Sequence, residues 1–186
     1  MFNFFDYSIR PVAWTDKQIL LGWRNMESVR KFMYTDHVIS VNEHEIWFAK
    51  MMASSTDQYL IFLYKEQPIG TISFTQINIQ HKRCSWAFYL GERNAPRGCG
   101  SVMEYLAIEF AFSNIGITKL HCEVLSLNST VISLHKKFGF TQEGCLRRHY
   151  FKGTHFEDVI MLSLLSDEWQ KLRAKQRERI FGLEVI

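Results

Sequence analysis

The chain has 186 residues, of which 47% are hydrophobic, 22% charged and 15% aromatic. This composition is typical of a folded globular protein and excludes an intrinsically disordered chain. The net charge of +3 suits an anionic small ligand, but the sequence lacks the long runs of like charge that are typical of nucleic-acid-binding proteins. We therefore expect one domain over residues 1–186 that binds small molecules and no nucleic acid.

The four cysteines, Cys84, Cys99, Cys122 and Cys145, are far apart in the sequence. They form no C-x-x-C pair, so the spacing predicts neither a zinc site nor a thioredoxin motif, and no metal is expected. No segment approaches the roughly 18 continuous apolar residues that a membrane span needs, and the first residues do not form a signal-peptide pattern. We expect a reduced, cytoplasmic protein that does not associate with membranes.

The first half of the chain alternates helical and strand-like patterns. Strand patterns fall at 5–12, 59–64, 69–79 and 83–90, and helical patterns at about 16–23, 28–34 and from 41 onward. Thr15 or Asp16 is expected to cap the first helix. Ser40 and Glu43 form a capping box before the third helix. The three later strands predict an antiparallel meander.

The second half of the chain has a different order of elements, in which predicted helices separate most of the predicted strands. Helical patterns cover about 100–112, 129–138 and 167–179, and strand patterns cover 119–125, 140–151 and 156–165. A turn is expected at 152–155, and the charged segment 166–186 is expected to be a surface helix and tail. This order of elements predicts an α+β fold built on a mixed sheet.

A glycine-containing loop, Pro96-Arg97-Gly98-Cys99-Gly100-Ser101, joins a predicted strand to a predicted helix. Glycines let the backbone approach an anion, and a helix start offers free N–H groups and the positive end of a dipole. Arg97 adds a mobile positive charge. By itself, such a loop more often marks an ordinary turn. It also lacks the Lys-Ser/Thr pair of a Walker loop and the third glycine of a dinucleotide fingerprint.

A second motif runs from Asn128 to Phe140, with the sequence NSTVISLHKKFGF. The two motifs, in this order and spacing, resemble the GCN5-related N-acetyltransferase family over residues 7–165. That family has a (Gln/Arg)-x-x-Gly-x-(Gly/Ala) loop after its fourth strand and an Asn-x-x-Ala-x-x-x-Tyr-x-x-x-Gly-Phe-like segment after its fifth. The resemblance implies an α/β/α sandwich with a mixed, mostly antiparallel sheet, whose fourth and fifth strands splay to hold the pantetheine arm of acetyl-CoA.

The resemblance also implies acetyl-CoA as the cosubstrate. Ala95 stands where the family usually has Gln or Arg, so we expect the backbone N–H groups of 97–102, with Arg97, to bind the pyrophosphate. Backbone groups near 88–91 would bind the pantetheine and the developing oxyanion. The amine attacks directly, so no cysteine nucleophile is expected. The expected cofactor residues are Phe88, Tyr89, Leu90, Gly91, Arg97, Gly98, Cys99, Gly100, Ser101, Val102, Asn128 and Lys137.

Two residues are candidates for proton transfer. His135 stands where the family usually has its tyrosine acid, and the resemblance implies that it protonates the departing thiolate. Its spacing alone favours a core histidine, because it shares a helical stripe with apolar residues. Glu123 lies on a predicted central strand; if it is partly buried, its raised pKa makes it a base, acting directly or through water. Otherwise it is a solvated or salt-bridged side chain.

Aromatic and basic residues of the first half indicate the acceptor site. An arginine beside aromatic rings suits a phosphorylated, planar ligand, although Phe32 and Met33 in a helix are equally typical of a core. Segments 23–25, 32–34 and 39–48, with 75–78 and 120–124, resemble a group within the family that acetylates the 4-amino group of UDP-linked 4-amino-4,6-dideoxy-N-acetylaltrosamine in pseudaminic acid biosynthesis. The expected acceptor residues are Arg24, Met33, Tyr34, His44, Trp47 and Tyr89.

Two other functions are compatible with the sequence. An N-acetyltransferase of the same fold would act on ribosomal-protein N-termini or polyamines, but such enzymes need an acidic or peptide-accepting groove, against which Arg24 and the aromatic residues argue. A non-catalytic acetyl-CoA-binding module would keep the loop without a placed acid and base, and a histidine in place of the tyrosine at 135 favours it. The sequence leaves homo-oligomerisation open.

Overall fold

The computed structural model describes residues 1–182, and the last four residues of the expected tail lie outside this range. Seven strands form one sheet in the order β1-β2-β3-β4-β5-β7-β6. Neighbouring strands are antiparallel except for β4 and β5, which are parallel, so the predicted mixed and mostly antiparallel sheet is confirmed. The strands are β1 Tyr7–Pro11, β2 Gln58–Tyr64, β3 Gln67–Asn78, β4 Arg83–Leu90, β5 Lys119–Leu125, β6 Thr141–Lys152 and β7 His155–Leu165.

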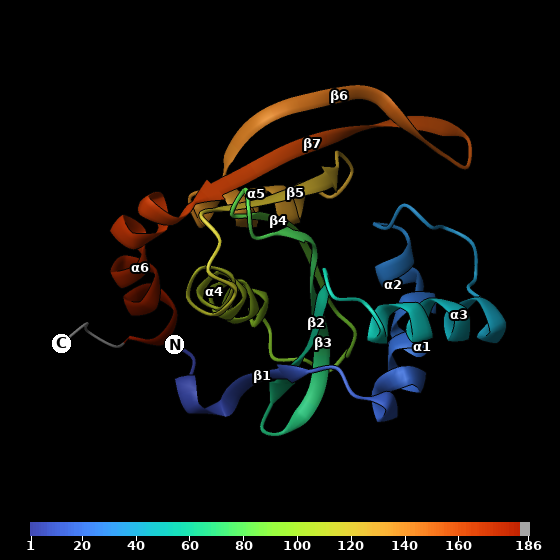
Figure 1. Cartoon of the computed structure of the whole chain (residues 1–186), viewed down its shortest axis with the longest axis horizontal. Helices are drawn as coiled ribbons and strands as arrows, with labels where there is room; N and C mark the ends of the chain where they lie inside the picture. Colours follow the sequence, from blue (N-terminus) through green and yellow to red (C-terminus); the bar gives the residue numbers. More distant parts are fainter. Residues whose placement is uncertain (183–186) are drawn as a thin grey trace.

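Helices cover both faces of the sheet, as the resemblance implied (Figure 1). The helices are α1 Lys17–Asn25, α2 Glu27–Arg30, α3 Val41–Met52, α4 Gly100–Phe110, α5 Ser129–Lys137 and α6 Ser166–Phe181. Strand β2 shows why two layers form, since its side chains alternate between the faces. Leu60 and Phe62 pack into the core beneath α4 and α6, whereas Ile61 and Leu63 pack beneath α1 and α3.

Strands β4 and β5 part after a short stretch of pairing. Their register runs only from Arg83 opposite Lys119 to Ser85 opposite His121, although both strands continue for four or five more residues. The facing edges of residues 86–90 and 122–125 therefore make no ladder with each other. This is the splay that the resemblance implied, and it opens a wedge in the middle of the sheet.

Two predicted helices differ from the structure. The helix expected over 28–34 is wrong in extent, because α2 ends at Arg30 and Phe32 and Met33 lie in the following loop. Helix α6 is not wholly a surface helix: Trp169 and Ile180 are buried against α4 and its neighbours. The amide of Phe2 also donates to the carbonyl of Ile180, which joins the N-terminus to α6.

The loop after α2 is held by the long β6–β7 hairpin, which arches over the sheet toward the N-terminal helices (Figure 1). Lys152 Nζ donates to the carbonyl of Met33 at 2.7 Å, and the Tyr150 hydroxyl donates to the carbonyl of Tyr34. The main-chain carbonyls at the end of this segment are therefore bonded to the hairpin. Tertiary contacts override the local helical spacing here.

An ion pair fixes the start of α1 against the sheet. The Arg10 guanidinium on β1 donates to both carboxylate oxygens of Asp16 at 2.6 and 2.8 Å, and the amide of Ala13 donates to the same carboxylate at 2.8 Å. These hydrogen bonds hold the pKa of Asp16 below its ordinary value although burial opposes them. Such a carboxylate stabilises the fold above about pH 4, and the contribution is lost as the pH falls through the folded-state pKa.

We predict that Asp16→Asn lowers the free energy of unfolding at pH 7 by about 1–2 kcal/mol, since charged hydrogen bonds are lost while the half-exposed arginine is screened. The deficit relative to wild type should shrink toward pH 3, because wild type then loses the same interaction. Urea unfolding across this pH range measures both effects. Asp6→Asn is the control, because Lys65 lies 4.0 Å from Asp6 in an exposed pair. A pH-independent deficit for Asp16→Asn would contradict the assignment.

Candidate active site

Two cavities meet at the splayed end of β4. One, of about 390 Å³, lies between the sheet and the N-terminal helices, and we call it the acceptor cavity. The other, of about 920 Å³, follows the wedge between β4 and β5 to the α4 loop and α5, and we call it the groove. Both are lined by Met33 and by Ala87, Phe88 and Tyr89 of β4. Molecules bound in the two cavities would therefore meet at β4.

The groove ends at the loop before α4. Gly98 has φ of +87°, a conformation that favours glycine. The amides of Cys99 and Ser101 donate to the carbonyls of Pro96 and Gly98, both at 3.0 Å. The expectation that every amide of 97–102 is free is therefore wrong, because the loop closes two of them into its own turns. Within residues 1–182, the amides of Gly98, Gly100 and Val102 have no acceptor, and they remain for an anion.

The structure divides the expected cofactor residues other than Gly91 into three groups. Eight of them line the groove: Phe88, Tyr89, Leu90, Gly98, Gly100, Ser101, Asn128 and Lys137. Arg97 is exposed beside the loop. Cys99 and Val102 are fully buried, so their side chains belong to the core.

Gly91 does not fit its expected role in cofactor binding. Its amide is already bonded to the carbonyl of Ile69 at 2.9 Å. A Cβ at this position would lie 2.1 Å from the indole of Trp23, so the glycine serves close packing between β4 and α1. The backbone available to a ligand here is that of residues 86–90.

His135 lies in the groove wall with only 3% of its surface exposed. Its Nδ1 is 2.9 Å from Oε1 of Glu104, and Trp86 and Phe88 pack against its ring. Burial lowers the pKa of His135, but the Glu104 carboxylate, together with the Cys122 thiol, outweighs it and raises the pKa to about 10. An imidazole held in this way can remain protonated at neutral pH.

The spacing of cysteines and histidines did not indicate the neighbours of His135. The Cys122 thiol of β5 lies beside its ring, and Glu104 lies on α4, 31 residues earlier in the chain. Glu104 falls among apolar helix residues, where a single acidic residue gives no recognisable pattern. Only the packing of α4 against α5 brings this carboxylate to the imidazole.

Glu123 also lines the groove, but it is exposed rather than partly buried. The splay of β5 away from β4 opens its face of the strand, so the partial burial expected for this carboxylate is not found. Its Oε2 accepts a hydrogen bond from the Tyr34 hydroxyl at 2.7 Å. Burial and the neighbouring carboxylate raise the pKa of Tyr34, so the hydroxyl keeps its proton and stays a donor. The carboxylate is thus oriented at the mouth of the wedge.

The acceptor cavity contains a basic group without a partner. Arg24 of α1 lines the cavity, and its Nη1 is buried with no hydrogen-bond acceptor among the described residues. Burial lowers the pKa of this guanidinium, and the nearby Tyr89 opposes the shift. An unpaired buried guanidinium is costly, and an anionic ligand group would satisfy it.

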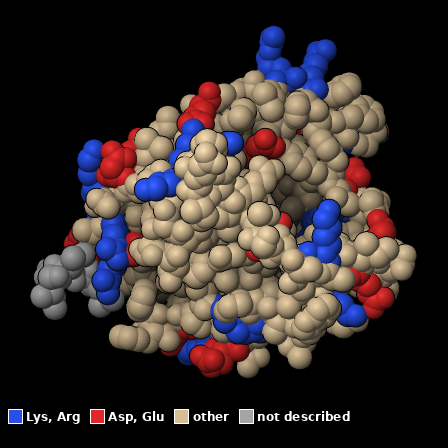
Figure 2. All heavy atoms as spheres, viewed as in Figure 1, with Lys and Arg blue, Asp and Glu red and all other residues tan. Residues whose placement is uncertain are grey.

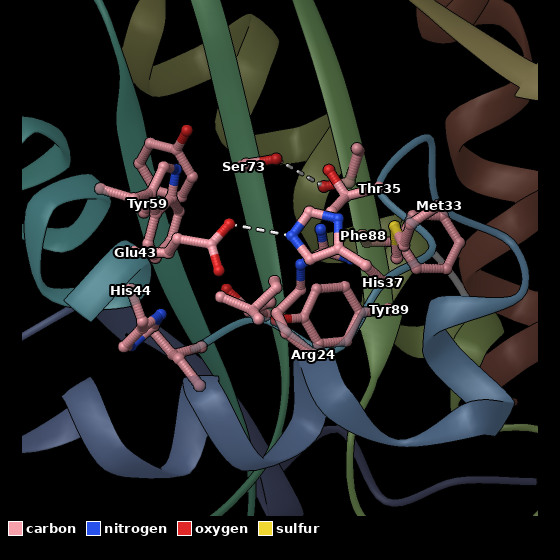
Figure 3. Close-up of a pocket in the computed structure, with 15 residues that line it drawn as sticks. Arg24, Met33, Thr35, His37, Glu43, His44, Tyr59, Ser73, Phe88 and Tyr89 are labelled. Carbon is pink, nitrogen blue, oxygen red and sulfur yellow. Dashed lines mark hydrogen bonds and ion pairs between the residues drawn. The ribbon is translucent and has the colours of Figure 1, made fainter. Parts of the chain in front are cut away.

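A histidine and a glutamate also line the acceptor cavity and form a hydrogen-bonded pair. His37 Nε2 lies 2.8 Å from Glu43 Oε1, and Figure 3 shows the two side chains facing each other over the pocket. The amide of Ser40 and the imidazole of His37 hold the pKa of Glu43 near 2. Ser40 and Glu43 also form the capping box that the sequence predicted for α3. This carboxylate therefore already has partners.

Most expected acceptor residues lie together. Arg24, Met33, His44, Trp47 and Tyr89 line the acceptor cavity, whereas Tyr34 lines the groove. His44 is 2% exposed, and its Nε2 donates to the carbonyl of Lys17 at 2.7 Å, so this nitrogen joins α3 to α1. Sequence reasoning missed six polar lining residues, which come from the α2–α3 segment, α3, β2 and β3: Thr35, His37, Glu43, Tyr59, Thr71 and Ser73.

The surface agrees with a site for small ligands. Figure 2 shows a hollow between the β6–β7 hairpin and the N-terminal helices, with charges of both signs scattered around this face. Within residues 1–182, no group of three or more His, Cys, Asp or Glu side chains is placed to hold a metal ion. None of the helices in that range is long and apolar enough to cross a membrane.

Comparison with known proteins gives one family match and several relatives. Residues 7–141 match the family described as "Acetyltransferase (GNAT) domain". The chain is 28% identical over 124 residues to "Acetyltransferase PseH" of Campylobacter jejuni, an alignment that covers 67% of this chain and 76% of that protein. It is 17% identical to the spermidine N(1)-acetyltransferase of Vibrio cholerae, covering 87% of this chain and 94% of that protein.

Solved structures show the same fold. The crystal structure of spermidine N-acetyltransferase from Vibrio cholerae in complex with CoA and spermine superposes with a TM-score of 0.83 and 17% sequence identity. The superposition covers 89% of this chain and 98% of that one. At this identity the likeness establishes the fold alone and not the acceptor.

We predict that Gly98→Ala weakens CoA binding about tenfold, because a side chain at φ of +87° strains the loop that presents the free amides. Isothermal titration with CoA measures the change. Gly116→Ala is the matched control, since Gly116 has φ of +77° at the far end of the α4 region and no atom lies within 4 Å of its added Cβ. Equal losses of CoA affinity in the two variants would show that strain, and not the loop amides, causes the effect.

Proposed function

Because the chain belongs to the acetyltransferase (GNAT) domain family, we propose that it transfers the acetyl group of acetyl-CoA to the 4-amino group of UDP-linked 4-amino-4,6-dideoxy-N-acetylaltrosamine. This reaction belongs to pseudaminic acid biosynthesis, which supplies the glycan of flagellin. Acetyl transfer from acetyl-CoA to an amine follows from the family. The identity of the acceptor is our proposal.

The unpartnered guanidinium of Arg24 is the observation that carries the choice of acceptor. It lies in a cavity walled by Trp47, Tyr59 and Tyr89. A UDP-sugar offers a diphosphate for an arginine and a planar base for aromatic rings. With the diphosphate near Arg24, the sugar would extend toward Ala87 and Phe88, where the cavity meets the groove.

A polyamine acceptor is the second candidate, since the spermidine acetyltransferases align over more of the chain than PseH does. Polyamines are polycations, which carboxylates recognise and an unpaired arginine repels. Among the described residues, Glu43 is the one carboxylate in the acceptor cavity, and His37 and Ser40 already engage it. The higher identity to PseH and the charge of the cavity both favour the nucleotide sugar.

Direct transfer requires that the acceptor amine lose a proton and approach the thioester carbon. In our proposal the Glu123 carboxylate, oriented by Tyr34, takes the proton from the amine, directly or through a water. The nitrogen forms the new C–N bond as the C–S bond breaks. Unpaired backbone groups along residues 86–90 of β4 face the wedge, and an amide there would hold the negative charge that develops on the carbonyl oxygen.

The leaving thiolate requires a proton, and His135 is the proposed donor. The imidazole lines the groove, and Glu104 and Cys122 favour its charged form. The Gly98, Gly100 and Val102 amides, with Arg97, would hold the pyrophosphate and so fix the thioester in the wedge. Together these groups satisfy the proton balance: one proton leaves the amine and one reaches the sulfur.

We predict that Arg24→Ala raises KM for the UDP-aminosugar by about 10–100-fold, because a charged hydrogen bond to phosphate is lost. CoA binding should be nearly unchanged, since the cavity and not the groove is altered. Arg24→Lys should fall between, because it keeps the charge without the bidentate geometry. A thiol-release assay with a panel of UDP-aminosugars, polyamines and peptides measures these values. Faster turnover of spermidine than of any nucleotide sugar would refute the proposed acceptor.

We predict that Glu123→Gln lowers kcat by about 10²-fold near pH 7 and that the deficit shrinks as the pH rises toward the pKa of the acceptor amine. At higher pH the neutral amine becomes abundant without a base. The pH dependence of kcat for both proteins is the measurement. Glu66→Gln, at the exposed β2–β3 turn, is the control. A constant ratio at all pH values would argue against Glu123 as the base.

A further inference from the structure

A carboxylate is buried beneath the groove, on the core side of His135. Glu104 of α4 has 0% of its surface exposed. Its Oε1 lies 2.9 Å from Nδ1 of His135, and its Oε2 has no hydrogen-bond partner among the described residues. A buried carboxylate loses its favourable hydration, and an apolar side chain at this position would avoid that cost. The contact with His135 is the interaction that offsets it.

The surroundings of the pair contain few other polar groups. Trp86, Phe88 and Phe140 pack around the imidazole. From β5, the Cys122 thiol faces the ring. Burial raises the pKa of the Glu104 carboxyl, and His135 together with Arg179 of α6 opposes this shift. In this setting one proton is held between the imidazole and the carboxylate.

We propose that Glu104 is a positioning residue for the acid of this enzyme: it holds the proton on Nδ1 of His135, orients the ring and keeps the imidazole charged, so that Nε2 is the nitrogen that donates to the leaving sulfur. This inference rests on the proposed role of His135. It accounts for how a histidine replaces the tyrosine that is usual at this position. A phenol is protonated at neutral pH without help, whereas an imidazole needs a neighbouring negative charge, here the buried carboxylate, to stay protonated.

The proposed transfer returns His135 to its starting protonation state. In the proposed starting state Nδ1–H is bonded to Glu104, and Nε2–H, on a ring that the Cys122 thiol also contacts, is the proton available to the leaving sulfur. As the C–S bond breaks, the Nε2 proton moves to the sulfur, which leaves as the CoA thiol, and the ring becomes the neutral Nδ1–H tautomer. A proton from solvent then returns to Nε2. Glu104 remains ionised throughout, as an orienting carboxylate does in a catalytic triad.

The pH dependence follows from the sign of the shift. The carboxylate raises the pKa of His135 to about 10, so the imidazolium persists at pH 8, where an ordinary histidine has lost its proton. Glu104→Gln keeps the size of the side chain and removes the charge. The pKa of His135 should then fall, and the alkaline limb of the kcat profile should move to lower pH.

The test compares wild type with Glu104→Gln. We expect kcat to fall about tenfold or more at pH 8.5 and less at pH 6, with KM for acetyl-CoA unchanged. NMR of protein labelled with ¹³C-histidine reads the His135 titration without any substrate, and its signal is assigned by its loss in His135→Tyr. Glu109→Gln is the matched control, since Glu109 lies on the same helix and bonds Trp169 and Arg173 instead.

Two further variants keep the outcome decisive. In a His135→Tyr background, which restores the usual acid, Glu104→Gln should no longer change the pH profile of kcat. Glu104→Asp retains the negative charge, so its kcat should fall at a higher pH than that of Glu104→Gln. If Glu104→Gln fails to fold, Glu104→Asp is compared with wild type in its place. An unshifted His135 titration, or a shifted titration with an unchanged kcat profile, would overturn the inference. Full activity of His135→Phe would instead overturn the proposed acid itself.

Discussion

The pairing of β4 with β5 ends at Ser85 and His121, and the site depends on that ending. A parallel ladder that continued would bond residues 86–90 to 122–125 and leave no wedge. Because the ladder stops, β4 has backbone groups free on one edge, Glu123 faces open space, and His135 of α5 becomes part of a groove wall. The order of the strands alone does not create a site; the loss of a few hydrogen bonds between two of them does.

Two cavities that meet at one strand explain how two substrates can be bound by largely different residues and still react. The groove offers amides and a buried imidazole, which suit a phosphorylated thioester, and the acceptor cavity offers aromatic rings and Arg24. Residues 87–89 belong to both. The chemistry is therefore confined to the place where the walls coincide, and each ligand can be recognised largely on its own side.

Sequence patterns predicted the sheet, most helix and strand positions and the α3 capping box, because these follow from local periodicity. Eight of the twelve cofactor residues expected from the two spaced motifs line the groove. The patterns failed where distant segments decide the outcome. The segment 31–34 has helical spacing but forms a loop, whose carbonyls accept hydrogen bonds from Lys152 and Tyr150. Glu104 is a single acid among apolar residues, and its role appears only when α5 places His135 beside it. Gly91 was expected to bind the cofactor, whereas its close packing against Trp23 explains why a glycine stands at this position.

The contacts of the β6–β7 hairpin with the acceptor wall have an evolutionary consequence. Lys152 and Tyr150 donate hydrogen bonds to the main-chain carbonyls of residues 33 and 34. Every amino acid has such a carbonyl, so these bonds do not depend on the side chains at the two positions. Mutations that alter the side chains there can therefore remodel the acceptor cavity while the loop stays anchored. Because Met33 and Tyr34 also line the groove, such changes alter its wall as well, but they leave His135 on α5 in place. Such separation allows one acetylating scaffold to diversify toward unrelated amines.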